Sequence, residues 1–93
     1  MDLVKLLKRI QNSYLIKGEY LFNWLKENDK YIVYDCYEFV DGVVNVPIGD
    51  YTLYAYDKET DELVQLNPKE TDLSKFKDVP IPKGFEIKEG YIF

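Results

Sequence analysis

The sequence predicts an α+β fold in which one long N-terminal helix packs on a small antiparallel meander of about five strands. Three observations support this prediction. Apolar residues recur with a helical period through residues 2–28, the period changes to two from Tyr31 onward, and turn signals separate the later apolar runs. The chain has 93 residues, the length of one domain, so we expect residues 1–93 to form a single domain.

The predicted helix covers residues 2–28, and Trp24, beside its apolar stripe, is expected to pack it on the sheet. Two features near 12–18 leave open whether this is one helix or two. Asn12-Ser13 can act as an internal cap, and Gly18 costs about 1 kcal/mol relative to alanine in a helix interior. Gly18 is explained either by a break or by the close approach of another backbone. The stripe itself consists of Leu3, Leu7, Ile10, Tyr14, Leu21 and Leu25.

The strands are predicted from alternating apolar and aromatic residues, which suit a pleated surface. The first strand covers 31–40 and is followed by Asp41-Gly42, a strong signal for a two-residue hairpin. Further strands are expected in the segments VVNVPI, YTLYAYD, ELVQL and GFEIKEGYIF. Before the last of these, Asn67 as the N-cap and Pro68 as the first helical residue predict one short helix near 68–76.

Composition excludes several classes of site. The chain has one cysteine, Cys36, and no histidine, which rules out an internal disulfide, a zinc site built on Cys and His, and an imidazole base. A net charge of −5 opposes direct binding to nucleic acid. No apolar run is long enough to span a bilayer and the N-terminus lacks a signal-peptide pattern, so we expect a cytoplasmic protein, in the host cytoplasm if it is viral.

Charge is distributed unevenly along the chain. Residues 1–18 carry four basic side chains and one acidic side chain, whereas residues 19–93 carry eight basic and sixteen acidic ones. A basic amphipathic helix can lie on a membrane surface. The sheet, however, needs the apolar stripe of this helix as a packing partner, so we expect a core helix and no membrane contact.

The stretch YAYDKETDELV, residues 54–64, is the most function-like part of the sequence. Asp57, Glu59 and Asp61 stand two apart, as the first ligands of a calcium loop do. Counting from Asp57, however, the sixth position is Glu62 where such a loop needs glycine. We therefore expect a hairpin without metal or cofactor, in which Asp57 begins the turn and Asp61 adopts the left-handed conformation.

This hairpin is also the predicted partner-binding surface. It carries more acidic groups than a short loop needs for solubility, and two tyrosines just below the turn share one strand face, where they could supply contact area. We expect the partner to be a protein with a basic surface. The predicted contact residues are Tyr54, Tyr56, Asp57, Glu59, Asp61 and Glu62.

The sequence leaves three functions open. The first is a non-enzymatic acidic interaction module, comparable to virus-encoded inhibitors that occupy the basic surface of nucleic-acid-binding machinery. The second is a structural protein that self-associates, for example as a homodimer. The third is a small ligand-binding protein or an enzyme. Against an enzyme, Asp35 and Glu38 would point to opposite faces of a strand and cannot act as a pair, and Cys36 is expected in the core.

Overall fold

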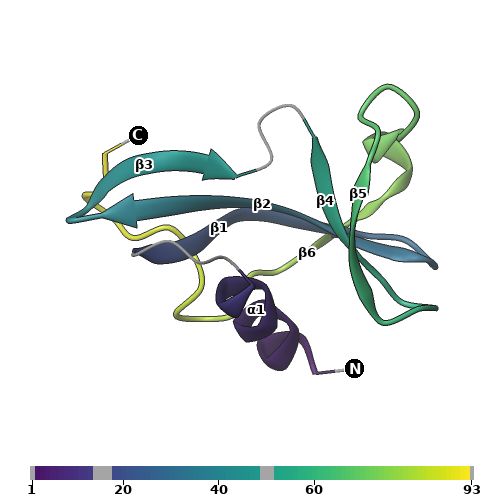
Figure 1. The fold of residues 1–93 in the computed structure, drawn as a ribbon, viewed down its shortest axis with the longest axis horizontal. Coiled ribbons are helices and arrows are strands. Elements are labelled where there is room, and N and C mark those ends of the chain that lie inside the picture. The colour runs from purple at the N-terminus through teal and green to yellow at the C-terminus, as the bar shows by residue number, and fades with distance from the viewer. Residues whose placement is uncertain (1, 14–17, 49–51, 93) are drawn as a thin grey trace.

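The computed structural model of the chain describes residues 2–13, 18–48 and 52–92 (Figure 1). These residues confirm the α+β class, because one N-terminal helix packs on a 6-stranded antiparallel sheet. No helix among them is long and apolar enough to cross a membrane. In chain order the elements are α1 (Leu3–Asn12), β1 (Glu19–Glu27), β2 (Tyr31–Val40), β3 (Val43–Ile48), β4 (Leu53–Asp57), β5 (Glu62–Leu66), the 3₁₀ turn η1 (Leu73–Lys75) and β6 (Lys77–Val79).

The prediction of a helix through residues 2–28 is wrong beyond Asn12. The helix α1 begins after Asp2, whose side chain accepts a hydrogen bond from the amide of Val4 at 3.0 Å, and it ends at Asn12. The part of the prediction that fell on residues 14–17 lies outside the described residues. Glu19–Glu27 form the strand β1, which pairs with β2 from end to end.

A β-bulge explains why β1 does not look like a strand in sequence. Its register with β2 shifts between Phe22 and Trp24, which interrupts the alternation of side chains between the two faces. Tyr20 and Phe22 before the bulge therefore enter the same core as Leu25 after it. Without a period of two, only the aromatic content of the segment indicates a strand, and pairing with β2 decides the outcome.

Gly18 allows the start of β1 to lie close against β2. A Cβ atom placed on Gly18 would stand 2.8 Å from Cγ of Glu38 and 2.9 Å from the carbonyl oxygen of Phe39. Real Cβ atoms do not approach other atoms this closely, so a side chain here would displace β2 or the Glu38 side chain. Of the two explanations that the sequence offers for Gly18, the close approach of another backbone is therefore confirmed.

The strand β2 is the centre of the sheet. It pairs with β1 on one side, while on the other side its residues 31–34 pair with β4 and its residues 36–40 pair with β3. The full order is β5-β4-β2-β1-β6, with β3 also beside β2. The hairpin at Asp41-Gly42 is confirmed, because the φ angles of 53° and 78° are those of a type I′ turn. As Figure 1 shows, the β1–β2 turn and the β2–β3 turn lie at opposite ends of the molecule's long axis.

The predicted short helix near 68–76 is wrong. Asn67 does cap a turn, in which its carbonyl oxygen accepts from the amide of Glu70 at 3.0 Å, but no α-helix follows. The hydroxyl of Thr71 donates to the same carbonyl at 2.8 Å, and Asp72 caps η1 by accepting from the amide of Ser74 at 3.0 Å. Side-chain bonds of this kind compete with the helical pattern, which explains why only a 3₁₀ turn forms here.

The last strand of the sheet is β6, not the predicted C-terminal strand GFEIKEGYIF. The three residues of β6 pair with β1. Beyond it the chain makes two isolated bridges, Phe22 to Glu86 and Val43 to Ile92. A positive φ angle of 98° at Gly84 turns the chain just before the first bridge, and one of 90° at Gly90 turns it between the two bridges, so the segment lies along the β1 side and then reaches the β2–β3 hairpin.

The core lies between α1 and one face of the sheet. The predicted stripe is confirmed within α1, where Leu7 and Ile10 are fully buried and Leu3 packs at the border. Cys36 is a core residue, as predicted. Trp24 is half-buried on β1 and lies outside this cluster, so the prediction that it packs the helix on the sheet is wrong. The buried cluster contains Leu6, Leu7, Ile10, Tyr20, Phe22, Leu25, Ile32, Tyr34, Cys36, Tyr56 and Phe85.

The C-terminal segment covers part of the second face of the sheet. Val33 and Phe39 alternate with the core residues of β2 and are also buried. The ring of Tyr91 lies over Phe39, with ring centroids 4.9 Å apart. Glu19 holds the segment in place, because its carboxylate accepts from Lys88 Nζ and from the Tyr91 hydroxyl, each at 2.5 Å. Both faces of β2 are therefore covered at this end.

Ile10→Ala should lower the free energy of unfolding by about 2–5 kcal/mol, because it leaves a cavity at a fully buried position between helix and sheet. Val4 lies on the same helix and is 37% exposed, so Val4→Ala should change stability by no more than about 0.5 kcal/mol. Urea unfolding followed by circular dichroism measures both. Similar losses in the two variants would contradict the placement of the core.

Candidate functional site

The turn between β4 and β5 forms as the sequence predicts. Asp57 Oδ1 accepts from the amides of Glu59 at 2.9 Å and Thr60 at 3.3 Å, and the Asp57 carbonyl oxygen accepts from the amide of Asp61 at 2.9 Å. Asp61 has a φ of 59°, the predicted left-handed conformation. Since Asp57 is only 7% exposed, its carboxylate shapes the turn and contributes little to the outer surface.

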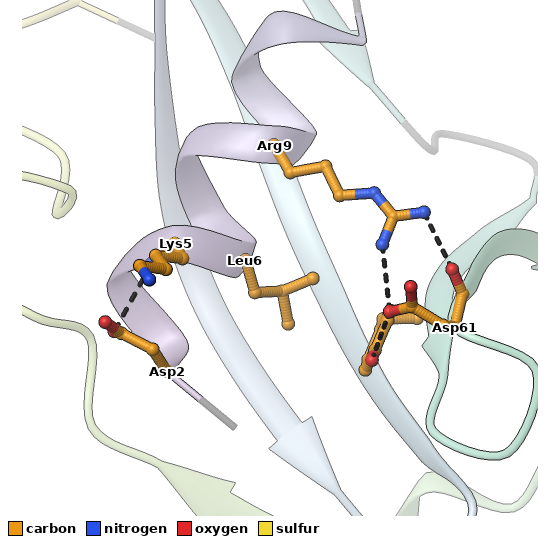
Figure 2. Close-up of a pocket in the computed structure, with 6 residues that line it drawn as sticks. Asp2, Lys5, Leu6, Arg9 and Asp61 are labelled. Carbon is orange, nitrogen blue, oxygen red and sulfur yellow. Dashed lines mark hydrogen bonds and ion pairs between the residues drawn. The ribbon is translucent and has the colours of Figure 1, made fainter.

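Asp61 ties the tip of this hairpin to α1, as Figure 2 shows. The Arg9 guanidinium donates from Nη1 to Asp61 Oδ1 at 3.1 Å and from Nη2 to the Asp61 carbonyl oxygen at 2.7 Å. The Tyr56 hydroxyl donates to the same Oδ1 at 2.7 Å. This hydrogen bond from Tyr56, followed by the charge of Arg9, holds the pKa of Asp61 below its ordinary value. The carboxylate is therefore ionised at neutral pH and held by two side chains.

Lys58 joins the β4–β5 hairpin to the β1–β2 hairpin. Its amide donates to the carbonyl oxygen of Lys30 at 2.8 Å. Its ammonium donates to the carbonyl oxygen of Asn28 at 2.7 Å and to Glu27 Oε2 at 3.3 Å. Asn28 in turn orders the β1–β2 turn, because its side chain accepts from the amides of Lys30 and Tyr31. Two turns far apart in sequence are thereby fixed side by side (Figure 1).

The joined turns gather carboxylates from both hairpins at one end of the molecule. Asp29, Glu59 and Glu62 are exposed to solvent, and Lys30 and Lys58 are the basic residues within the same turns. We call this surface the acidic end. It comprises Glu27, Asp29, Glu59, Asp61 and Glu62.

The predicted contact tyrosines share one strand face, as expected, but that face is turned toward α1. Tyr56 is 8% exposed and belongs to the core, where Arg9 Cζ lies 5.9 Å from the centre of its ring. Tyr54 is half-buried and its ring stacks on Tyr34 with centroids 6.4 Å apart. The structure thus separates the predicted set, leaving Glu59 and Glu62 on the outside and both tyrosines on the helix side of the hairpin.

Sequence reasoning missed Asp29, Glu27 and Arg9 as neighbours of the acidic hairpin. The Asn28-Asp29 pair does signal a turn, but nothing local indicates which other turn it will meet. That contact depends on β4 pairing with the first part of β2, which places the start of β2 beside the end of β4. The meeting of the two tips follows from the sheet order and could not be derived from either hairpin alone.

Glu38 is the one charged side chain among the described residues that is completely buried. Its Oε2 accepts from Asn45 Nδ2 at 3.0 Å, and its Oε1 has no hydrogen-bond partner. Asp35, three residues earlier, lies on the other face of β2, as the sequence predicts. A buried carboxylate in which one oxygen accepts no hydrogen bond lowers the stability of the fold.

The other candidate sites are of two kinds, a reactive thiol and a metal-binding cluster. Burial, with a smaller contribution from the charge of Asp35, raises the pKa of the Cys36 thiol to about 12, so this thiol is protonated at neutral pH. Within residues 2–13, 18–48 and 52–92, no group of three or more His, Cys, Asp or Glu side chains is arranged to hold a metal ion.

Comparison with protein-family models, with curated proteins and with solved structures finds no match to the chain.

Tyr56→Phe should raise the pKa of Asp61 toward its unfolded value of about 3.9, because it removes the largest cause of the shift. The stability that Asp61 contributes is present above that unfolded pKa and is lost as the pH falls through the lower folded pKa. Titration of the side-chain carboxyl carbons by NMR measures the effect. Asp72, whose pKa is lowered by Ser74, should titrate identically in both proteins, and an unchanged Asp61 would show that the hydroxyl does not bind it in solution.

Glu38→Met should raise the free energy of unfolding by about 1–3 kcal/mol, because an apolar side chain of similar length replaces a buried, half-satisfied carboxylate. Asn45 is exposed and can bond to water instead. Chemical denaturation at neutral pH measures the change, with Glu89→Met at an exposed position as the matched control. A destabilised Glu38→Met variant would mean that the carboxylate supports the fold through a contact beyond its bond to Asn45.

Proposed function

We propose that this chain is a non-enzymatic interaction module that applies its acidic end to a basic surface of a partner protein. The observation that carries the proposal is the hydrogen bond from the Lys58 amide to the Lys30 carbonyl oxygen, with the ammonium of Lys58 anchored on Asn28. These bonds fix two charged turns as one surface. Oriented exposed carboxylates attract a basic partner from a distance and set the orientation of encounter.

Rigidity of the acidic end favours this function. Asp57 and Asp61 are used inside the fold, one to shape the turn and the other to bind Arg9. The exposed carboxylates of Glu59, in the turn, and Glu62, at the start of β5, therefore stand on a backbone that is ordered before binding, which lowers the entropic cost of association. A protein with such a surface acts as an antagonist when it covers a basic site that a polyanion would otherwise occupy.

The ionisation of the side chains favours binding over catalysis. Hydrogen bonds from Lys88 and Tyr91 hold the pKa of Glu19 below its ordinary value, and the carboxylate of Asp61 is likewise kept ionised. The thiol of Cys36 is held in its protonated form. General acids and nucleophiles need pKa values shifted toward the working pH, and these three groups are shifted away from it.

Self-association is a second candidate function, favoured by the opposite end of the molecule. Val40, Val43 and Ile92 are 40%, 47% and 62% exposed around the β2–β3 turn. Ile92 is held there because its amide donates to the Gly42 carbonyl oxygen at 2.9 Å. Clustered exposed apolar side chains are typical of protein contacts. Sedimentation of the parent and of the Val43→Lys variant measures self-association and distinguishes this candidate from binding by the acidic end. The contact between copies is apolar, so it should be insensitive to salt.

The acidic end is tested with oligo-arginine as a basic probe. We expect the probe to shift the NMR signals of the Asp29, Glu59 and Glu62 amides at about 0.02 M salt and to lose its effect at about 0.5 M salt. Glu59→Lys combined with Glu62→Lys should remove these shifts, while the melting temperature stays close to that of the parent because exposed turn positions contribute little.

The control for this test changes the same net charge elsewhere. Glu70→Lys combined with Glu89→Lys alters two exposed residues outside the acidic end, so it should keep the probe-induced shifts at Asp29. If both double variants lose binding equally, the probe responds to total charge alone and the acidic end has no special role.

A further inference from the structure

A groove runs between α1 and the β4–β5 hairpin. Its wider part has a volume of about 550 Å³, and it is lined by α1 on one side and by Leu63 of β5 on the other. The α1 side presents Lys5, Lys8 and Arg9, followed by Asn12 and Ser13 at the end of the helix.

The groove continues into a narrower hollow of about 170 Å³ beside β5. Ser13 and Leu63 line both parts, so the two parts are adjacent. In the narrower part the lining includes Tyr34 and Tyr54, together with Val64 and Gln65. The groove thus changes from basic near the start of the helix to aromatic near its end.

The groove lies beside an edge of the sheet. The order β5-β4-β2-β1-β6 places β5 at one end, and β4 is its partner among the described residues. An edge strand presents backbone amide and carbonyl groups that can pair with another extended chain. Leu63 is opposite Tyr56 in the hairpin and Gln65 is opposite Tyr54, so the lining side chains of β5 face α1.

The charge of the groove is opposite to that of the chain as a whole. Lys5 and Lys8 are exposed, whereas Arg9 is already paired with Asp61. The net charge of the chain is −5, so this cluster of cations is a local exception that selects a negatively charged occupant.

We infer that this groove binds an extended acidic segment of a partner protein, which adds to β5 as a further strand. Residues that alternate along a strand are about 6–7 Å apart on one face. Lys5 and Lys8, three apart on a helix, have Cβ atoms about 5–6 Å apart, so carboxylates at alternate positions of the segment can reach both. The next residue on that face lies over Tyr54, where an apolar side chain fits. The recognised pattern is therefore acidic-x-acidic-x-apolar.

This inference goes beyond the proposed function, because it concerns a surface of the opposite charge. A short peptide labelled with fluorescein tests it. Its alternate positions are glutamate, glutamate and valine, and threonine stands between them. We expect fluorescence anisotropy to detect binding at low salt and NMR to show shifts in the amides of β5. Glu59→Lys combined with Glu62→Lys should still bind this peptide, so a failure of the acidic end is distinguishable from a failure of the groove.

Charge reversal in the groove provides the main variant. Lys5→Glu combined with Lys8→Glu should weaken peptide binding by about tenfold or more, whereas the same change at Lys69 and Lys75, exposed residues away from the groove, should weaken it by less than about twofold. Equal losses in the two variants would overturn the inference. Circular dichroism confirms that both variants remain folded, as expected for exposed positions.

Strand addition is tested by changing the peptide and leaving the protein intact. Methylation of alternate backbone nitrogens removes donors from one edge of the peptide, and the complementary pattern removes them from the other edge. One pattern should abolish binding and the other should preserve it, because a strand pairs through one edge. Equal binding by both would overturn strand addition. Tighter binding of oligothymidylate than of the peptide would overturn an acidic protein segment as the occupant.

Discussion

The pairing of β1 with β2 is the interaction on which the rest of this structure depends. It converts a segment with a near-helical apolar pattern into a strand and supplies Phe22 and Leu25 to the core beneath α1. It needs two local departures from regular structure. The bulge after Phe22 realigns the side chains, and Gly18 lets the start of β1 lie against Glu38. The helix α1 ends at Asn12 and buries a single stripe against the sheet.

The same pairing determines where charge accumulates. β2 begins beside the end of β4, so the β1–β2 turn meets the β4–β5 turn, and Lys58 bonds the two together. At the other end of β2 the turn at Asp41-Gly42 meets Ile92 and leaves apolar side chains exposed. One central strand therefore separates an acidic end from an apolar end. Each end combines residues from distant segments, so the sequence shows only the β4–β5 part of the acidic end as a contiguous feature.

The sequence predicts features that depend on local chemistry. Asp41-Gly42 requires positive φ angles, and Asp57 and Asp61 suit the turn that they form, so these hairpins could be located in advance. Features decided by tertiary contacts could not be predicted. A bulged strand lacks the alternation that identifies strands, and Asn67 caps a turn as readily as a helix. The outward position expected for Tyr56 failed for the same reason, because which face of β4 meets α1 is set by the register of the whole sheet.

Arg9 explains how a basic helix and an acidic hairpin coexist at close range. Its guanidinium satisfies both the carboxylate and the carbonyl oxygen of Asp61, so the charges of these two residues largely cancel where helix and hairpin meet. Lys5 and Lys8 are exposed beside the groove, and Glu59 and Glu62 are exposed at the tip of the hairpin. Both charged surfaces are exposed and screened by salt, so each contributes little to the stability of the fold. The stability of the fold rests instead on the pairing of the strands and on the apolar contact between α1 and the sheet.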